Sequence, residues 1–180
     1  MLGFRRIYER KLKQYLESIH FQGGDVLDVG CGQGQYSDIF KNNNYLGIDI
    51  DTKAINYARK KYNNSRFEIM DMTKIDLLDS SFDFVFSVAV LHHLEDGDLL
   101  VALKEILRVT KNKGHIWIVD IVLPPSLNFL AYPFFYIDKG AKIRSFQKLS
   151  QMLSGTFKIK SSRLERFYVF GIALFEIEKI

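Results

Sequence analysis

The stretch DVLDVGCGQG, residues 25–34, decides the fold of this 180-residue chain. Its first half is a short, mainly apolar run typical of a buried strand, and its second half places Gly30, Gly32 and Gly34 at alternate positions. Glycine adopts positive φ without strain and lets another group approach the main chain closely. We therefore expect a strand that ends in a tight turn before a helix, at the edge of a sheet where open α/β proteins bind their ligands.

The residues around this stretch alternate between short apolar runs and helical patterns. Such alternation predicts βαβ units, and hence a parallel sheet with helices on both faces. We expect Asp51 to cap the helix after the second strand, and Asp96 or Asp98 to cap the next helix. The expected strands are 25–30, 45–50, 66–70, 82–88 and 114–121, and the expected helices are 4–20, 33–42, 52–62 and 97–110.

The last third of the chain follows a different pattern. Residues 122–140 hold all three prolines and a cluster of aromatic side chains, and a short helix is expected at about 145–154, capped by Ser145. Two strands, 156–166 and 167–178, follow with a connection too short for a parallel crossover, so they should pair antiparallel. The fold class we expect is a Rossmann-like, doubly wound α/β sheet, mostly parallel and closed by a C-terminal antiparallel β-hairpin.

Composition places the chain among ordinary globular proteins, with 47% hydrophobic and 26% charged residues. We expect one domain, no membrane span and no signal peptide, and the single cysteine, Cys31, favours the reducing cytoplasm. The net charge of +4 divides into an acidic middle, 21–138, and basic flanks, 1–20 and 139–180. This distribution argues against a dedicated nucleic-acid binder. The flanks are either ordinary solvated surface or a field that attracts an anionic substrate.

Acidic residues stand at the ends of three successive expected strands. Asp49 follows Gly30 by 19 residues, where its carboxylate would accept both hydroxyls of a ribose. Asp71 follows the third strand, within reach of an adenine amino group, and Asp28 lies in the first strand. Each acid alone would also suit a helix cap or a turn. Beside a glycine turn, the three together indicate a nucleoside-binding edge.

These motifs resemble those of the class I S-adenosylmethionine-dependent methyltransferases, in particular the small type-11-like group. Residues 27–34 are similar to the acidic, glycine-rich first motif, and Lys113-Gly114-His115 departs slightly from the glycine turn before the fifth strand. The resemblance covers about residues 25–121 and implies the seven-stranded methyltransferase fold. The other matching segments are 47–50, 67–72, 82–94 and 103–116.

The resemblance implies an S-adenosylmethionine site, with S-adenosylhomocysteine as the product. Asp28 would offset the positive amino group of the methionine part, through water. The chain would then be a single methyltransferase domain with an N-terminal helix (1–24), a cofactor-binding core (25–121), an acceptor-side lid (122–155) and a C-terminal hairpin (156–180). The implied cofactor-binding residues are Asp28, Gly30, Cys31, Gly32, Gly34, Asp49, Ile50, Asp71, Met72, Ser87, Val88 and His92.

His92 and His93 are paired titratable side chains at this edge. A histidine there is suited to take a proton from an acceptor hydroxyl or amine near neutral pH, and His92 is the better candidate for a catalytic base. The alternative is that the pair holds the loop or contacts the cofactor through its backbone. Cys31 is expected to be a buried filler rather than a nucleophile. We expect no metal site, because no cluster has metal-ligand spacing.

The acceptor is expected to be a small molecule, mostly apolar or aromatic, methylated on an O, N or C atom. Tyr132, Tyr136 and Arg144 are candidate polar contacts for it, unless the aromatic segment simply packs on the first helix. Residues 87–90 lack the Asn/Asp-Pro-Pro-aromatic box of enzymes that methylate base amines, so a nucleic-acid acceptor is not expected. Because the first strand begins after Gly24, we expect the sheet to tolerate loss of residues 1–20.

The glycine turn also occurs in proteins with two other functions. A nicotinamide-dependent oxidoreductase would share the first βαβ unit, but its Gly-x-Gly-x-x-Gly pattern needs glycine where Gln35 stands. That function is therefore disfavoured. A cofactor-binding subunit without catalytic activity, which assists another protein, stays open.

Overall fold

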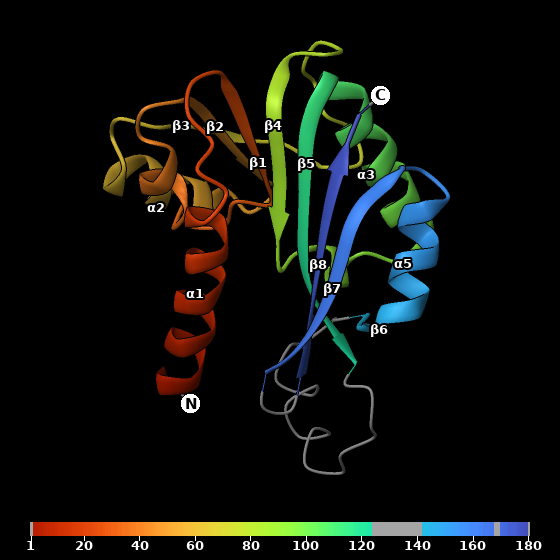
Figure 1. Ribbon diagram of the computed structural model, residues 1–180. Coiled ribbons are helices and arrows are strands. Elements are labelled where there is room, and N and C mark those ends of the chain that lie inside the picture. Colours follow the sequence, from red (N-terminus) through yellow and green to blue (C-terminus); the bar gives the residue numbers. More distant parts are fainter. Residues whose placement is uncertain (1, 124–141, 168–169, 180) are drawn as a thin grey trace.

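The strands of the described residues form one sheet, in the order β3-β2-β1-β4-β5-β8-β7, with the short β6 beside β5 (Figure 1). The computed structural model describes residues 2–123, 142–167 and 170–179. The strands are β1 (Asp25–Val29), β2 (Asn44–Asp49), β3 (Arg66–Ile69), β4 (Phe82–Val88), β5 (Thr110–Leu123), β6 (Arg144–Ser145), β7 (Ile159–Phe167) and β8 (Phe170–Glu178). The helices are α1 (Leu2–Glu17), α2 (Thr52–Lys61), α3 (Asp96–Val109) and α5 (Phe146–Ser154), with 3-10 turns η1 (Ser37–Phe40) and η2 (Leu91–His93).

The direction of the strands confirms the expected fold class. β1 pairs in parallel with both β2 and β4, and β4 pairs in parallel with β5. β8 runs antiparallel to both β5 and β7, so the hairpin closes the sheet. The strand order reverses at β1 and β4, and such a switch point is where open α/β sheets form their binding crevice. The glycine turn after β1 lies at this place.

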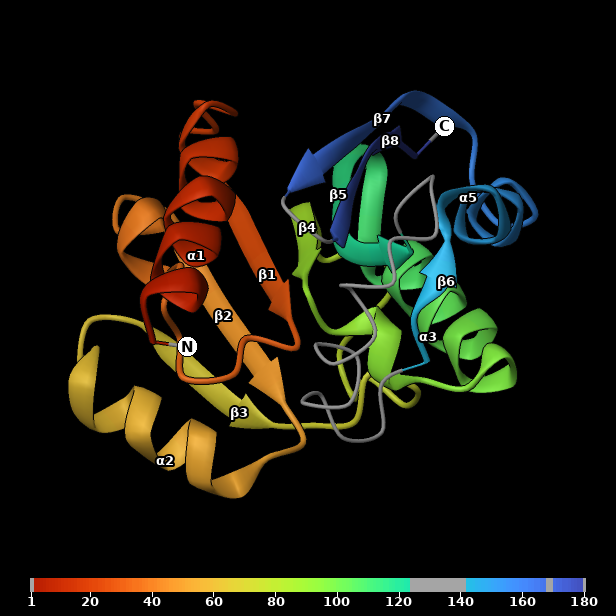
Figure 2. The ribbon, with the colours of Figure 1, turned by 90° about the horizontal axis from the view of Figure 1, so that it is seen from below.

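Two apolar clusters hold the helices on the two faces of the sheet. α3 and α5 pack on one face, through side chains such as Leu103, Ile106 and Leu149. α1, η1 and α2 pack on the other face, against aromatic residues of β4 that include Phe84 and Phe86. Figure 2, which looks along the sheet from below, shows α1 and α3 on opposite sides of the strands. Burial on both faces explains why β4 is a nearly continuous apolar run.

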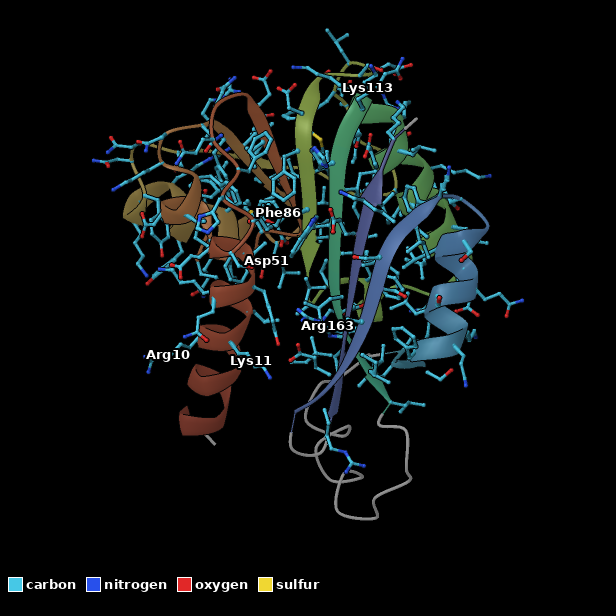
Figure 3. The ribbon with its side chains drawn as sticks, in the orientation of Figure 1. Arg10, Lys11, Asp51, Phe86, Lys113 and Arg163 are labelled. Carbon is cyan, nitrogen blue, oxygen red and sulfur yellow. The ribbon has the colours of Figure 1, made fainter. Side chains whose placement is uncertain are left out.

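Helix α1 belongs to the core of the described structure. Leu12 and Leu16 are buried in the same cluster as β1 and β4. The hydroxyl of Tyr15 donates to Glu165 of β7, and Arg163 lies over the Tyr15 ring at 5.5 Å from its centroid. Figure 3 shows Lys11, which also pairs with Glu165, and Arg163 facing the same gap between α1 and β7. These contacts argue against our expectation that the sheet tolerates loss of residues 1–20, because that loss would uncover one apolar face.

Two local expectations are wrong. The α-helix expected at 33–42 is the single 3-10 turn η1, because the glycine turn extends to Gly34 and β2 already begins at Asn44. The cap expected for α3 at Asp96 or Asp98 is also wrong, since Glu95 is the N-cap residue and makes no side-chain cap bond. Asp51 and Ser145 do cap α2 and α5, as expected.

About half of the segment expected to form the acceptor-side lid, residues 122–155, lies outside the described residues. Tyr132, Tyr136 and the aromatic residues around them lie in the interval 124–141, outside the described residues. No helix within the described ranges combines the length and apolar character needed to cross a membrane.

Candidate functional site

The three glycines after β1 have different surroundings, although all have positive φ, at 79°, 52° and 75°. A Cβ on Gly30 would lie 2.6 Å from Val90 Cγ1, and a Cβ on Gly34 would lie 2.6 Å from a ring carbon of Phe67. Those two positions therefore need glycine for internal packing as well as for conformation. A Cβ on Gly32 would meet no atom within 4 Å. Gly32 thus presents bare backbone to open space at the carboxyl edge of the sheet.

Asp49 lies directly against the glycine turn. Its Oδ2 accepts the backbone N–H of Gly32 at 2.8 Å, and its Oδ1 accepts the N–H of Asp51 at 2.9 Å. Each carboxylate oxygen has a second lone pair, so Asp49 still has acceptor capacity for hydroxyl groups. Ile50, the next residue, is 69% exposed and offers an apolar surface beside the carboxylate. The structure therefore brings Gly32, Asp49 and Ile50 together at one edge.

The turn after β3 contains Asp71 and Met72. Asp71 is exposed, and its Oδ1 accepts both the N–H and the hydroxyl of Thr73 at 2.8 Å. Met72 is buried in the cluster that packs against α3. Asp71 therefore shapes the turn after β3, and its contact with an adenine stays a prediction.

Asp28 is enclosed rather than open. The residue is 1% exposed, and the hydroxyl of Tyr45 donates to its Oδ2 at 2.7 Å. Burial raises the pKa of Asp28 from 3.8 to about 7, and the nearby Asp49 charge acts in the same direction, while the Tyr45 hydrogen bond opposes it. Near neutral pH, the protein thus holds an acid here whose charge a nearby cation would favour.

The raised pKa of Asp28 has a consequence for stability. Between pH 4 and 7 the native state binds more protons here than the unfolded chain, so the free energy of unfolding falls as pH rises and the loss is complete above about pH 7. We expect the wild type to lose stability relative to Asp28→Asn over this interval. Urea titrations of both proteins at several pH values measure the difference. If the free energies of unfolding of the two proteins change with pH in parallel, the pKa of Asp28 is not raised in the native state.

The remaining predicted residues of the turn and of β4 are buried. Cys31 is covered, and burial raises the pKa of its thiol far above the ordinary value, so the thiol is neutral and unsuited to nucleophilic attack. Val88 ends β4 within the cluster beneath α1. The hydroxyl of Ser87 is buried and has no hydrogen-bond partner among the described residues. A ligand or water at this edge of the sheet would supply the missing hydrogen bond.

The loop after β4 lies against the glycine turn. Ala89 has a φ of 54°, a left-handed conformation that is uncommon outside glycine and is associated with functional loops, and Val90 fills the space beside Gly30. His92 is buried and His93 is exposed, with their ring centroids 4.2 Å apart. Nδ1 of His92 lies 2.6 Å from Oδ1 of Asp120 on β5.

Asp120 is a site residue that the sequence reasoning missed. It is a buried acid in the middle of the apolar run IWIVDIV, residues 116–122. An acid in a strand that is covered on both faces must have a partner, since an unpaired buried charge is costly. That isolated acid was the available signal, and its partner, 28 residues away, was not evident from the sequence.

Arg144 is buried and bonded within the protein. Its side chain is 4% exposed, and its Nε donates to Oδ1 of Asp96 at 2.8 Å. Its other nitrogens donate to the backbone carbonyls of Leu91, at 3.3 Å, and of Leu94, at 2.6 Å. The guanidinium therefore holds both ends of η2, the turn that carries His92. This structural role argues against our expectation that Arg144 is a polar contact for the acceptor.

Replacing Arg144 should be costly. Arg144→Met leaves the carbonyls of η2 without their charged donor, and we expect a loss of roughly 2–4 kcal/mol in the free energy of unfolding. Lys148 is a matched control, because it pairs with the same Asp96 at 2.6 Å but is 53% exposed. Lys148→Met should cost less than about 1 kcal/mol. Chemical denaturation of the two variants tests this, and equal losses would show that Arg144 is no more than a surface charge.

Known protein families and structures resemble this chain in sequence and in fold. The profile of a methyltransferase domain family matches residues 27–118, just over half of the chain. The chain belongs to this family, and the resemblance to class I, type-11-like methyltransferases is confirmed. A SAM-dependent methyltransferase structure from Methanosarcina mazei superposes with a TM-score of 0.77 at 20% identity, covering 89% of this chain and 94% of that one.

Curated relatives share the domain but differ in their acceptors. A malonyl-[acyl-carrier protein] O-methyltransferase from Hamiltonella defensa subsp. Acyrthosiphon pisum is 30% identical over 132 residues, which is 71% of this chain and 50% of that protein. A tRNA (carboxymethyluridine(34)-5-O)-methyltransferase from Xenopus tropicalis is 27% identical over 117 residues, 61% of this chain and 18% of that protein. The chain therefore spans half or less of the length of these relatives.

Proposed function

We propose that the chain is an S-adenosylmethionine-dependent methyltransferase whose cofactor site lies at the carboxyl ends of β1, β2 and β4. The observation that carries this proposal is the pairing of Gly32 with Asp49. Gly32 offers backbone to open space, and the Asp49 carboxylate lies 2.8 Å from its amide nitrogen. The buried Ser87 hydroxyl without a described partner and the exposed side chain of Ile50 support the same location.

The residues of the site fit the parts of this cofactor. Gly32 allows the methionine part to lie on the main chain, and Asp49 would accept the two ribose hydroxyls. Ile50 and Met72 would frame the adenine, with Asp71 at its amino group. Asp28 would face the amino group of the methionine part, whose positive charge favours the ionised carboxylate. The cofactor, when bound, supplies a sulfonium-activated methyl group, so the protein's task is to align the acceptor and to exclude water.

The acceptor is proposed to be a small molecule, and the protein to be cytoplasmic. Residues 21–138 contain sixteen Asp and Glu against eleven Lys and Arg. This acidic charge favours a small-molecule acceptor over a polyanionic one, which it would repel. The relatives are named for both a carrier-bound malonyl group and a tRNA, so their names divide between the two kinds of acceptor.

The test begins with binding. S-adenosylmethionine and S-adenosylhomocysteine should each raise the melting temperature, as a ligand selective for the native state does, whereas NADH should not. Release of S-adenosylhomocysteine is then followed with pools of small hydroxyl, amine and carboxylate compounds and with total tRNA. No binding of either cofactor form would refute the proposal, and turnover of tRNA alone would refute its small-molecule part. Binding without turnover of any pool would favour the non-catalytic subunit.

A further inference from the structure

His92 and Asp120 form a buried pair next to the proposed cofactor edge. Both side chains are 2% exposed, and Nδ1 of His92 lies 2.6 Å from Oδ1 of Asp120. The same Oδ1 accepts the backbone N–H of Ile121 at 2.9 Å, which fixes the carboxylate on β5. Among the described residues, His93 contacts the His92 ring, and the buried cation Arg144 donates to the carbonyl of Leu91 at the start of the same turn.

The loop that holds His92 is fixed from several directions. Val90, two residues earlier, packs on Gly30 of the glycine turn. The carbonyl of His92 itself accepts the N–H of Lys142 at 2.5 Å, and Arg144 binds the two ends of η2. These contacts hold the imidazole against β5 and beside the proposed cofactor edge.

A carboxylate at Nδ1 determines which nitrogen of a neutral imidazole carries the proton. Asp120 accepts a hydrogen bond and donates none when it is ionised, so Nδ1 must carry the hydrogen. Nε2 is then the nitrogen with the lone pair and thus the basic atom of the ring. The same carboxylate stabilises the imidazolium that forms when Nε2 gains a proton.

We propose that Asp120 is a positioning residue that holds His92 as an Nε2 base, and that the acceptor is a hydroxyl or amine group that must lose a proton. This inference rests on the proposed methyltransferase function. The acceptor's lone pair forms the bond to the methyl carbon, and the electrons of the broken carbon–sulfur bond remain on sulfur. The acceptor's proton passes to Nε2 of His92, and then to water when the product leaves. A carboxylate acceptor carries no such proton and would need no base.

The first test reads the tautomer directly and needs no acceptor. In protein labelled with ¹⁵N-histidine, two-dimensional NMR distinguishes Nδ1–H from Nε2–H rings, and His92→Gln identifies the His92 signals. We expect the Nδ1–H form in the wild type near neutral pH, and loss of that form in Asp120→Asn, whose amide can donate to Nδ1. An Nε2–H ring or a doubly protonated ring in the wild type near neutral pH would overturn the proposal.

The second test uses turnover of the acceptor pools. Hydroxyl or amine compounds should be active, with carboxylates inert. Asp120→Asn should lower kcat by roughly 10²- to 10³-fold, with little change in KM or in affinity for S-adenosylmethionine. Asp120→Glu, which keeps the charge, should recover part of the loss. In a His92→Gln background, Asp120→Asn should lower kcat no further, because Asp120 acts through the ring.

The outcomes separate this inference from the function on which it rests. Normal cofactor binding with turnover of carboxylates alone would overturn the hydroxyl or amine acceptor while leaving a methyltransferase. Equal losses from Asp120→Asn with and without His92 would show that Asp120 supports the fold and not the base. Failure of cofactor binding in the wild type would instead refute the methyltransferase proposal, and the NMR measurement would still decide the tautomer.

Discussion

Gly32→Val is expected to abolish the thermal stabilisation by S-adenosylmethionine. At a hundredfold excess over its dissociation constant, the cofactor should stabilise the wild type by about 2.7 kcal/mol, which is roughly 5–10 °C in melting temperature for a domain of this size. A side chain on Gly32 meets no protein atom within 4 Å, so its branches would occupy the open space that we assign to the methionine part. Differential scanning fluorimetry with and without cofactor measures the shift.

Gly23→Val is the matched control for this experiment. Gly23 has a φ of 75°, and a Cβ there also meets no atom within 4 Å, so a valine suffers backbone strain of the same kind in open surroundings. Gly23 precedes β1, at the end of the strand opposite to the glycine turn. The Gly23 variant should lose some stability and keep the full cofactor shift. A normal shift in the Gly32 variant would show that the cofactor does not lie on this turn.

Only part of the glycine turn could be predicted from the sequence. The spacing of Gly30, Gly32 and Gly34 predicted the turn and its place at the edge of the sheet. The spacing did not distinguish the three, because their roles depend on Val90 and Phe67, which are distant in the sequence. Local patterns therefore predicted the backbone, whereas the packing partners required the folded chain.

The wrong predictions for Asp96 and Arg144 also arose from partners that are distant in the sequence. Asp96 has the residue type and the position of a helix cap. Its carboxylate instead binds Arg144 and Lys148, and Arg144 lies 48 residues further along the chain. Arg144 was expected to contact the acceptor because its partner Asp96 is equally distant from it in the sequence. An ion pair formed across such a distance overrides a local capping preference of about 1 kcal/mol, and no spacing rule reports it.

The His92 and Asp120 pair was predicted only in part. His92 was predicted as a candidate base from its position after the fourth strand, and that role stays a prediction. Asp120 lies 28 residues away on the neighbouring strand, in register just beyond the end of β4. The order of strands in the sheet is what brings the two together, so the pair becomes visible once β4 and β5 are known to be neighbours.

Asp49→Ala is expected to weaken cofactor binding by roughly 2–4 kcal/mol, because two ribose hydroxyls would lose a charged acceptor. The variant also releases the backbone N–H groups of Gly32 and Asp51, which loosens the turn. Isothermal titration with S-adenosylhomocysteine measures the affinity, and denaturation measures the accompanying loss of stability. Asp51→Ala is the comparison, because Asp51 caps α2 through the N–H groups of Lys53 and Ala54. It should cost about 1 kcal/mol of stability and leave the affinity nearly unchanged.

A modified ligand separates the hydroxyl contact from the effect on the turn. If Asp49 accepts the ribose hydroxyls, removing the 2′-hydroxyl of S-adenosylhomocysteine should weaken binding to the wild type. The same change should matter far less in Asp49→Ala, where the acceptor is already missing. If the two losses simply add, Asp49 acts by shaping the backbone of Gly32 and the ribose is held elsewhere. Equal affinity losses in Asp49→Ala and Asp51→Ala would show that neither carboxylate contacts the ribose.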